Sequence, residues 1–246
     1  MKPPVGGTQI VKRSMAARPV VVEDPRSYIA ESYRVLRTNL HYANPDAPLR
    51  RLLVTSAGEG EGKSTTVANL GACYAQTERS VLLIDADLRR PTLAGRFGLP
   101  SAPGLSSYLG GDALLEAVIQ KTSVPNLSLV ASGPTPPNPA ELSGSRRMRE
   151  MLEALSERFD IIVIDSPPVL AVSDAGALAS AVDGVLLVVG SGTVARAQLR
   201  RAKEAIEAVH GRIVGAVLNG FDPTAQGYSR KYYDRYDKYY TTKGGA

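Results

Sequence analysis

The stretch "TSAGEGEGKSTTVANLGA" at residues 55–72 decides the fold. An apolar run, "RLLVTS" at 51–56, leads into it, and a helical pattern follows from residue 64. Gly58, Gly60 and Gly62 precede Lys63 and Ser64. Glycines let backbone N–H groups surround a polyphosphate at a helix N-terminus, a lysine neutralises the β and γ oxygens, and a hydroxyl holds Mg²⁺. The stretch therefore predicts a phosphate-binding loop between a strand and a helix.

The loop departs from the usual G-x-x-x-x-G-K-[ST] pattern at its first position, where Ala57 stands. The turn must therefore accept a methyl group there. Asn219, at the end of "AVLNGFD", corresponds to an adenine-contacting residue of related folds, although a turn before Gly220 explains it equally well. The expected nucleotide-binding residues are Gly58, Glu59, Gly60, Glu61, Gly62, Lys63, Ser64, Thr65 and Asn219.

Short apolar runs alternate with longer helical patterns along the chain. The expected strands are 51–56, 80–86, 127–132, 160–166, 184–190 and 212–219, and the expected helices are 64–79, 112–121, 140–158, 173–182 and 194–209. Continuous apolar runs suit strands that are buried on both faces, and the alternation is that of right-handed βαβ units. The sequence predicts an α/β fold: a doubly wound, mainly parallel sheet with helices on both faces.

The length of 246 residues and the hydrophobic content of 43% are sufficient for one large domain. We expect a flexible segment at 1–22, the folded domain at 23–221 and a flexible tail at 222–246. The domain is expected to open with a helix at about 25–43, with Asp24 as its N-cap and Pro25 in the first helical position.

Several classes of protein are disfavoured by composition. No apolar run approaches the roughly 18 residues that span a bilayer, and the first residues do not resemble a signal peptide, so we expect a cytoplasmic protein. The single cysteine, Cys73, allows neither an internal disulfide nor a cysteine-pair metal site. The net charge of +5 is too small and too dispersed to indicate nucleic-acid binding.

Three aspartates follow apolar runs. Asp85 and Asp87 lie in "VLLIDADLRRP" and Asp165 lies in "IIVIDSPPV". The carboxyl ends of parallel strands are where such folds bind ligands, so the three carboxylates should converge on the phosphate loop. Mg²⁺ prefers oxygen ligands, and this set suits a nucleoside triphosphate site. One such aspartate alone would more simply be a turn or a helix cap.

Taken together, these motifs resemble the bacterial tyrosine kinases of capsule and exopolysaccharide machinery, over nearly the whole chain. The resemblance rests on residues 57–65, "LLIDADLR" at 82–89, "IVIDSPP" at 162–168, the E-x-x-R-x-x-R helix motif and a terminal tyrosine cluster. It implies ATP and Mg²⁺ as cofactors and Lys63, Asp85, Asp87 and Asp165 as catalytic residues. Ser64, Asp87 and Asp165 would then act on the metal, and Asp85 is the candidate acceptor of the tyrosine proton. The division of work between Asp85 and Asp87 stays open.

The alternative is a regulatory ATPase of the related partitioning and division-site type, which would use its tail only for binding. Those ATPases carry a signature lysine where this chain has Gly58, which argues against that reading. Arg89 has a possible role near the phosphates.

Six of the eleven tyrosines of the chain gather in "YSRKYYDRYDKYY" at 228–240. They are Tyr228, Tyr232, Tyr233, Tyr236, Tyr239 and Tyr240. A packed terminal helix or a tail that binds RNA or lipid would each explain part of this composition. However, the tyrosines form no single helical stripe, and Asp234 and Asp237 dilute the charge. The cluster is most simply a set of phosphoacceptors.

The motif residues Glu31, Arg34 and Arg37 recur at a spacing that places them on one side of a helix. An ordinary surface ion pair would explain them in isolation. The family resemblance instead implies a contact between subunits of a ring, in which one subunit's tail enters the next subunit's site. It also implies a transmembrane adaptor that stimulates the kinase, an opposing tyrosine phosphatase, and a place at the inner face of the membrane.

Overall fold

The computed structural model describes residues 18–43 and 48–221. In this part of the chain, seven strands form one sheet in the order β3-β4-β2-β5-β1-β6-β7. The strands are β1 Arg51–Ser56, β2 Val81–Asp85, β3 Ile119–Lys121, β4 Leu127–Val130, β5 Ile161–Asp165, β6 Gly184–Gly190 and β7 Ile213–Asn219. Neighbouring strands are parallel except for β3, which pairs antiparallel with β4. The predicted fold class is confirmed.

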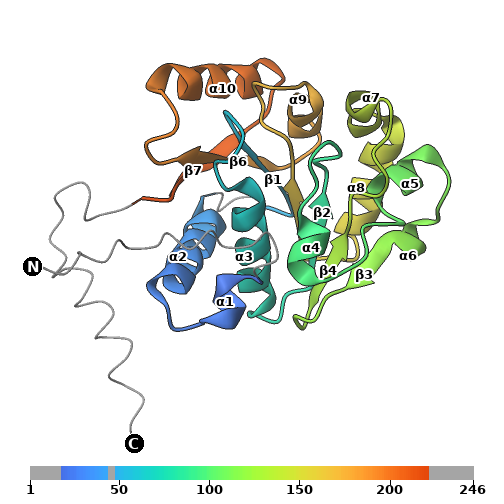
Figure 1. The fold of residues 1–246 in the computed structure, drawn as a ribbon, viewed down its shortest axis with the longest axis horizontal. Helices are drawn as coiled ribbons and strands as arrows, with labels where there is room; N and C mark the ends of the chain where they lie inside the picture. Colours follow the sequence, from blue (N-terminus) through green and yellow to red (C-terminus); the bar gives the residue numbers. More distant parts are fainter. Residues whose placement is uncertain (1–17, 44–47, 222–246) are drawn as a thin grey trace, which may run out of the picture.

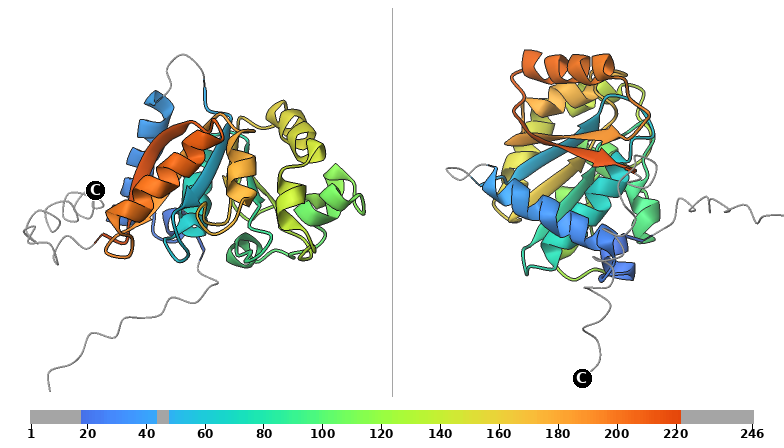
Figure 2. Two further views of the ribbon diagram at one scale, coloured as in Figure 1. Left: turned by 90° about the horizontal axis from the view of Figure 1, so that it is seen from above. Right: turned by 90° about the vertical axis from the view of Figure 1, so that its left-hand side faces the viewer.

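Helices cover both faces of the sheet, as Figures 1 and 2 show. They are α1 Val20–Glu23, α2 Tyr28–Tyr42, α3 Lys63–Ala75, α4 Leu93–Phe97, α5 Leu105–Gly110, α6 Leu115–Val118, α7 Pro139–Ser143, α8 Arg146–Ser156, α9 Asp174–Ala179 and α10 Arg196–Ala208. In the right-hand view of Figure 2, α2 and α3 lie beneath the sheet while α9 and α10 lie above it. None of these helices is long and apolar enough to span a membrane.

The central strands are mostly apolar because they are packed on both faces. Leu52 and Val54 of β1 belong to the core beneath α2 and α3, whereas Leu53 belongs to the core beneath α8, α9 and α10. Successive residues of a strand point to opposite faces, so a strand between two helical layers has no polar face. This burial explains why the continuous apolar runs identified the central strands correctly.

Three helix predictions were wrong in detail. The helix expected at 112–121 is limited to α6, and residues 119–121 form β3 on the open side of β4. The helix expected at 140–158 is two helices, because Ser145 caps α8 by accepting a hydrogen bond from the Met148 amide at 3.1 Å. Helix α2 begins at Tyr28 and is capped by Ser27, not by Asp24.

The folded part also begins earlier than residue 23. Residues 20–23 form α1, and both Val20 and Val21 are buried. The Val21 amide donates to the side-chain oxygen of Asn69 at 3.2 Å, and the Gln76 side chain donates to the Val21 carbonyl at 3.0 Å. This short helix therefore packs against α3, the helix that follows the phosphate loop.

One carboxylate joins the amino ends of β1 and β6. Asp183 accepts hydrogen bonds from the backbone amides of Arg50 at 3.0 Å and Arg51 at 2.8 Å, and from the Arg51 guanidinium at 2.8 Å. Partial burial works to raise the pKa of Asp183, but the hydrogen bonds from Arg51 and Arg50 outweigh it and hold the pKa below its usual value.

We expect Asp183→Ala to lower the free energy of unfolding by about 1–3 kcal/mol, because it leaves the two amides and the guanidinium without their acceptor. The depressed pKa means that the stabilisation is fully present above the unfolded-state pKa, near 4, and is lost as the pH falls through the folded-state value. Urea unfolding of both proteins between about pH 7 and pH 3 measures this. A stability difference that does not shrink on acidification would contradict the assignment.

Candidate active site

The phosphate loop connects β1 to α3 and turns sharply at two glycines. Gly60 has a φ of +75° and Gly62 a φ of +97°, a region in which side chains are strained. A Cβ at Gly62 would also lie 1.9 Å from the side-chain nitrogen of Asn219. Lys63, Ser64 and Thr65 then open α3. The loop has the geometry that the sequence predicted, and it presents the N-terminus of a thirteen-residue helix.

The buried side chain of Glu61 connects the phosphate loop to the end of β6. Its carboxylate, 2% exposed, accepts hydrogen bonds from the amide of Gly58 and, at 2.9 Å, from the amide of Gly190 at the end of β6. The Asn219 side chain donates to the Glu61 carbonyl at 2.9 Å. Glu61 and Asn219 therefore fix the phosphate loop to the carboxyl ends of β6 and β7. The sequence reasoning missed this supporting role, and contact of Asn219 with a base stays a prediction.

Asp85 and Asp165 lie side by side, because they are paired residues in the register of β2 and β5. Both carboxylates are fully buried, and Asp87 and Lys63 are nearly so. Oδ2 of Asp85 accepts hydrogen bonds from the Thr92 amide at 3.0 Å and the Leu93 amide at 2.9 Å, at the start of α4. Its Oδ1 has no partner among the described residues.

Asp87 lies in the loop after β2. Its Oδ1 accepts hydrogen bonds from the amides of Arg89 at 3.3 Å and Arg90 at 3.0 Å. The structure therefore brings the three predicted aspartates together. Strand pairing positions Asp85 and Asp165, and the loop after β2 positions Asp87.

Burial raises the pKa of the Asp85 carboxyl above its usual value. Burial, followed by the neighbouring Asp85 charge, does the same to Asp165. Two carboxylates this close and this deeply buried are costly to ionise together unless a cation joins them. The site is thus built to accept positive charge.

Unpaired polar atoms gather at the same place. Within the described residues, seven buried side-chain nitrogen or oxygen atoms lack a hydrogen-bond partner, and all except the Ser143 hydroxyl belong to residues around the ends of β2 and β5. These atoms are Thr66 Oγ1, Asp85 Oδ1, Thr92 Oγ1, Arg96 Nε and both carboxylate oxygens of Asp165. Buried polar groups are normally satisfied, so such a concentration marks a place that awaits ligands. Carboxylate oxygens beside a serine hydroxyl are donors that suit Mg²⁺.

A cleft of about 560 Å³ opens over these groups. Its lining includes Lys63, Ser64 and Asp87, together with Arg89 and Arg90 of the loop after β2. Pro167 and Pro168, which follow Asp165, form another part of the wall. The cleft thus combines the phosphate loop with the two acidic strand ends, as the sequence predicted.

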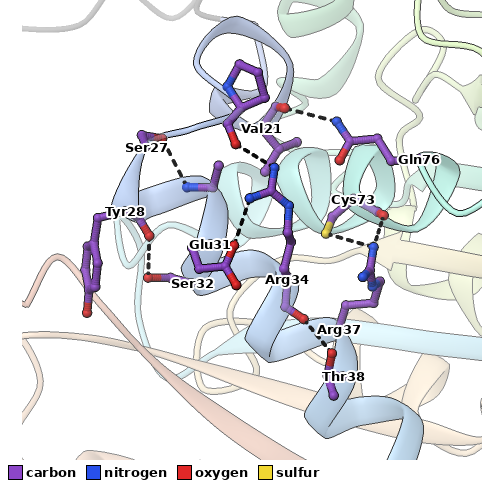
Figure 3. Close-up of polar contacts among 12 residues, drawn as sticks. Val21, Ser27, Tyr28, Glu31, Ser32, Arg34, Arg37, Thr38, Cys73 and Gln76 are labelled. Carbon is purple, nitrogen blue, oxygen red and sulfur yellow. Dashed lines mark hydrogen bonds and ion pairs between the residues drawn. The ribbon is translucent and has the colours of Figure 1, made fainter. Parts of the chain in front are cut away.

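The E-x-x-R-x-x-R motif lies on α2, and its residues do not line the cleft. Figure 3 shows the contacts that the motif makes. Arg34 forms an ion pair with Glu31 at 2.8 Å and also donates to the Pro25 carbonyl. Arg37 donates to the Cys73 carbonyl of α3 at 2.8 Å. Within this chain the motif braces α2 on α3, and its contact with another subunit stays a prediction. The six tail tyrosines lie outside the described residues.

The chain matches known proteins over most of its length. Residues 53–216 match a family model described as an AAA domain. The chain is 41% identical to the tyrosine-protein kinase YwqD of Bacillus subtilis, over 82% of this chain and 85% of that protein. It is 39% identical to the tyrosine-protein kinase CpsD of Streptococcus agalactiae, over 80% of this chain and 86% of that protein.

A solved structure of a tyrosine kinase domain has a similar fold. The kinase domain of the Escherichia coli tyrosine kinase ETK superimposes with a TM-score of 0.80 at 35% identity, covering 87% of this chain and 84% of that one. The fold and the site define a nucleotide-binding P-loop protein. The chain belongs to the bacterial tyrosine kinases and is a protein-tyrosine kinase.

We expect Glu61→Ala to weaken ADP binding about 10-fold, because the phosphate loop loses its link to β6 and becomes less ordered before the nucleotide arrives. Isothermal titration calorimetry with ADP measures the affinity. Glu116→Ala, which removes an exposed carboxylate paired with Arg158 outside the cleft, is the control and should retain wild-type affinity. Equal affinities for both variants would show that Glu61 does not organise the loop.

Proposed function

We propose that this kinase uses ATP and Mg²⁺ to phosphorylate tyrosines of its own C-terminal cluster. The observation that carries the proposal is that Lys63, Ser64 and Asp87 line one cleft, beside the buried Asp85–Asp165 pair. Phosphoryl transfer needs alignment and charge stabilisation more than covalent chemistry, and the lining of this cleft supplies charged groups from the segments that follow β1 and β2.

Each group has a distinct task in this proposal. Lys63 and the amides of the phosphate loop hold the nucleotide's phosphates. Ser64, Asp87 and Asp165 hold Mg²⁺ directly or through water, and the metal supplies charge neutralisation when it is bound. The buried Asp165 carboxylate interacts with the Ser64 hydroxyl, which supports this set.

Asp85 is the residue that receives the proton of the attacking phenol. Its Oδ2 is fixed by the amides of Thr92 and Leu93, which leaves Oδ1 as the free acceptor. A phenol has a reference pKa near 10, so a fixed carboxylate that accepts its proton assists the attack on phosphorus. The raised pKa of Asp85, caused by burial, also makes it a better base than an exposed aspartate.

The acceptors are Tyr228, Tyr232, Tyr233, Tyr236, Tyr239 and Tyr240. Each phosphate adds about −1.5 to −2 charge, so six would add roughly −9 to −12 and reverse the chain's net charge of +5. The cluster begins six residues after Asp222, and six residues span at most roughly 20 Å, a length that permits entry either into the chain's own site or into a neighbour's.

The kinase assembles as a ring in which the tail of one subunit enters the site of the next. The exposed side of α2 supports this assembly, since Glu31 and Arg34 keep 30% of their side-chain surface exposed and Tyr28 and Val35 are also exposed. Exposed apolar side chains beside an ion pair suit a subunit interface. Phosphorylated tails would repel one another and loosen the ring.

The family resemblance supplies the cellular setting. The kinase is stimulated by the cytoplasmic tail of a transmembrane adaptor, is opposed by a tyrosine phosphatase, and regulates the synthesis and export of capsule or exopolysaccharide. It acts in the cytoplasm, at the inner face of the membrane. Nucleic acid has no part in this function. Family membership favours the kinase over a regulatory ATPase that would use its tail only for binding.

Intact-protein mass after incubation with Mg-ATP tests autophosphorylation. The wild type should gain several phosphates that map to the tail, whereas Lys63→Met should gain none because it lacks the cation that neutralises the β and γ oxygens. A variant with all six tail tyrosines changed to phenylalanine should also gain none while it still binds nucleotide. Hydrolysis of ATP without any gain of mass, with candidate adaptor tails present, would favour the regulatory ATPase.

Light scattering coupled to gel filtration tests the ring. Changing Glu31, Arg34 and Arg37 to alanine should shift the unphosphorylated protein from an oligomer to a monomer, and full phosphorylation of the wild type should do the same. The matched control changes Arg196, Arg200 and Glu204 to alanine, which are exposed residues of α10 in the opposite helical layer, and should stay oligomeric. A ring that survives full phosphorylation would refute the proposed switch.

A further inference from the structure

A second charged pair borders the cleft. The Arg89 guanidinium contacts the Asp174 carboxylate through Nε to Oδ2 at 3.1 Å and Nη2 to Oδ1 at 3.2 Å. Arg89 lies in the loop after β2, and Asp174 is the first residue of α9, beyond the loop that follows β5. The pair therefore joins the segments that follow β2 and β5, the two strands that end in Asp85 and Asp165.

The two partners differ in burial. The Asp174 side chain is 0% exposed, whereas that of Arg89 is 41% exposed. A buried carboxylate is strongly unfavourable without a cation, so Asp174 holds Arg89 tightly. A two-point contact fixes the plane of a guanidinium as well as its position. The remaining surface of Arg89 lines the same cleft as Lys63 and Ser64.

The position of Arg89 within the cleft follows from its neighbours. Arg90, the next residue, forms an ion pair with Glu59 of the phosphate loop. The amides of both arginines donate to Asp87. The Arg89 side chain is therefore tied to the start of α9, while the adjacent Arg90 ties the same loop to the phosphate loop.

We propose that Arg89 is a further catalytic residue of the kinase and that Asp174 is the residue that positions it. In the transfer, the bond from the γ-phosphorus to the bridging oxygen of ADP breaks, a bond to the phenol oxygen forms, and the phenol proton passes to Asp85. Arg89 exchanges no proton. Its guanidinium stabilises the negative charge on the transferring phosphoryl group, opposite to Lys63.

The inference rests on the proposed kinase site, so the assay measures ADP release and phosphate on tyrosine in parallel. The variants are Arg89→Met, Asp174→Asn and the double variant. Each single variant should lower kcat about 30- to 300-fold, because charge stabilisation in the transition state is lost or misplaced. The affinity for ADP should stay within about 3-fold of wild type, since ADP lacks the transferring group.

The double variant separates positioning from independent action. Because Asp174 acts through Arg89, the double variant should be no slower than Arg89→Met. It also removes the buried charge that Arg89→Met alone would leave without a partner, so it keeps the test valid if that single variant folds poorly. Arg89→Lys, which restores the charge without the two-point contact, should recover only part of the rate.

Asp183→Asn is the matched control, since it disrupts another arginine–aspartate pair at the opposite ends of the strands. It should lose stability but not kcat. Three outcomes would overturn the proposal: a wild-type kcat for Asp174→Asn, a double variant whose loss is the product of both single losses, or losses of kcat that follow thermal stability as in the control. If the wild type releases ADP without phosphorylating tyrosine, the proposed function fails, and the same comparison is then made on ADP release.

Discussion

The structure is organised around two buried carboxylates, those of Asp85 and Asp165, which are costly to ionise together without a nearby cation. Parallel pairing of β2 and β5 places Asp85 opposite Asp165, where water is excluded and like charges repel. A cation beside the two carboxylates would relieve this repulsion. The close approach of the two carboxylates therefore comes from sheet register, while α4 fixes one of them and Lys63 and Arg89 bring positive charge to the neighbouring cleft.

The surrounding elements keep the groups in place before any ligand arrives. The first amides of α4 hold one oxygen of Asp85, while Glu61 and Asn219 fix the phosphate loop to β6 and β7. On the far side of α3, α1 and α2 bind its surface through Val21 and Arg37. Such preorganisation lowers the entropy lost when the nucleotide binds. It also gives α2 a physical connection to the helix that begins at the phosphate loop.

The sequence predicted the central strands because residues buried on both faces must be apolar throughout. The predictions were wrong where the conformation of a segment depends on the elements packed beside it. Residues 119–121 follow a helical pattern, but the open edge of β4 offers backbone hydrogen bonds and draws them into β3. The helix expected at 140–158 is interrupted at Gly144 and Ser145, a pair that could have been recognised as an end followed by a cap. The sequence pattern predicted Asp24 as the cap of the first helix, whereas in the structure Ser27 caps it by accepting a hydrogen bond from the Ala30 amide.

The sequence alone determined the phosphate loop, the acidic strand ends and the class of fold, because glycine conformations, a lysine at a helix start and apolar strands act over short distances. The tertiary structure alone decided which groups meet. It placed Glu61 beneath the loop, turned Asn219 toward that loop, and joined Arg89 to Asp174 across 85 positions of the chain. Contacts between distant residues depend on strand order and register, which local patterns do not encode.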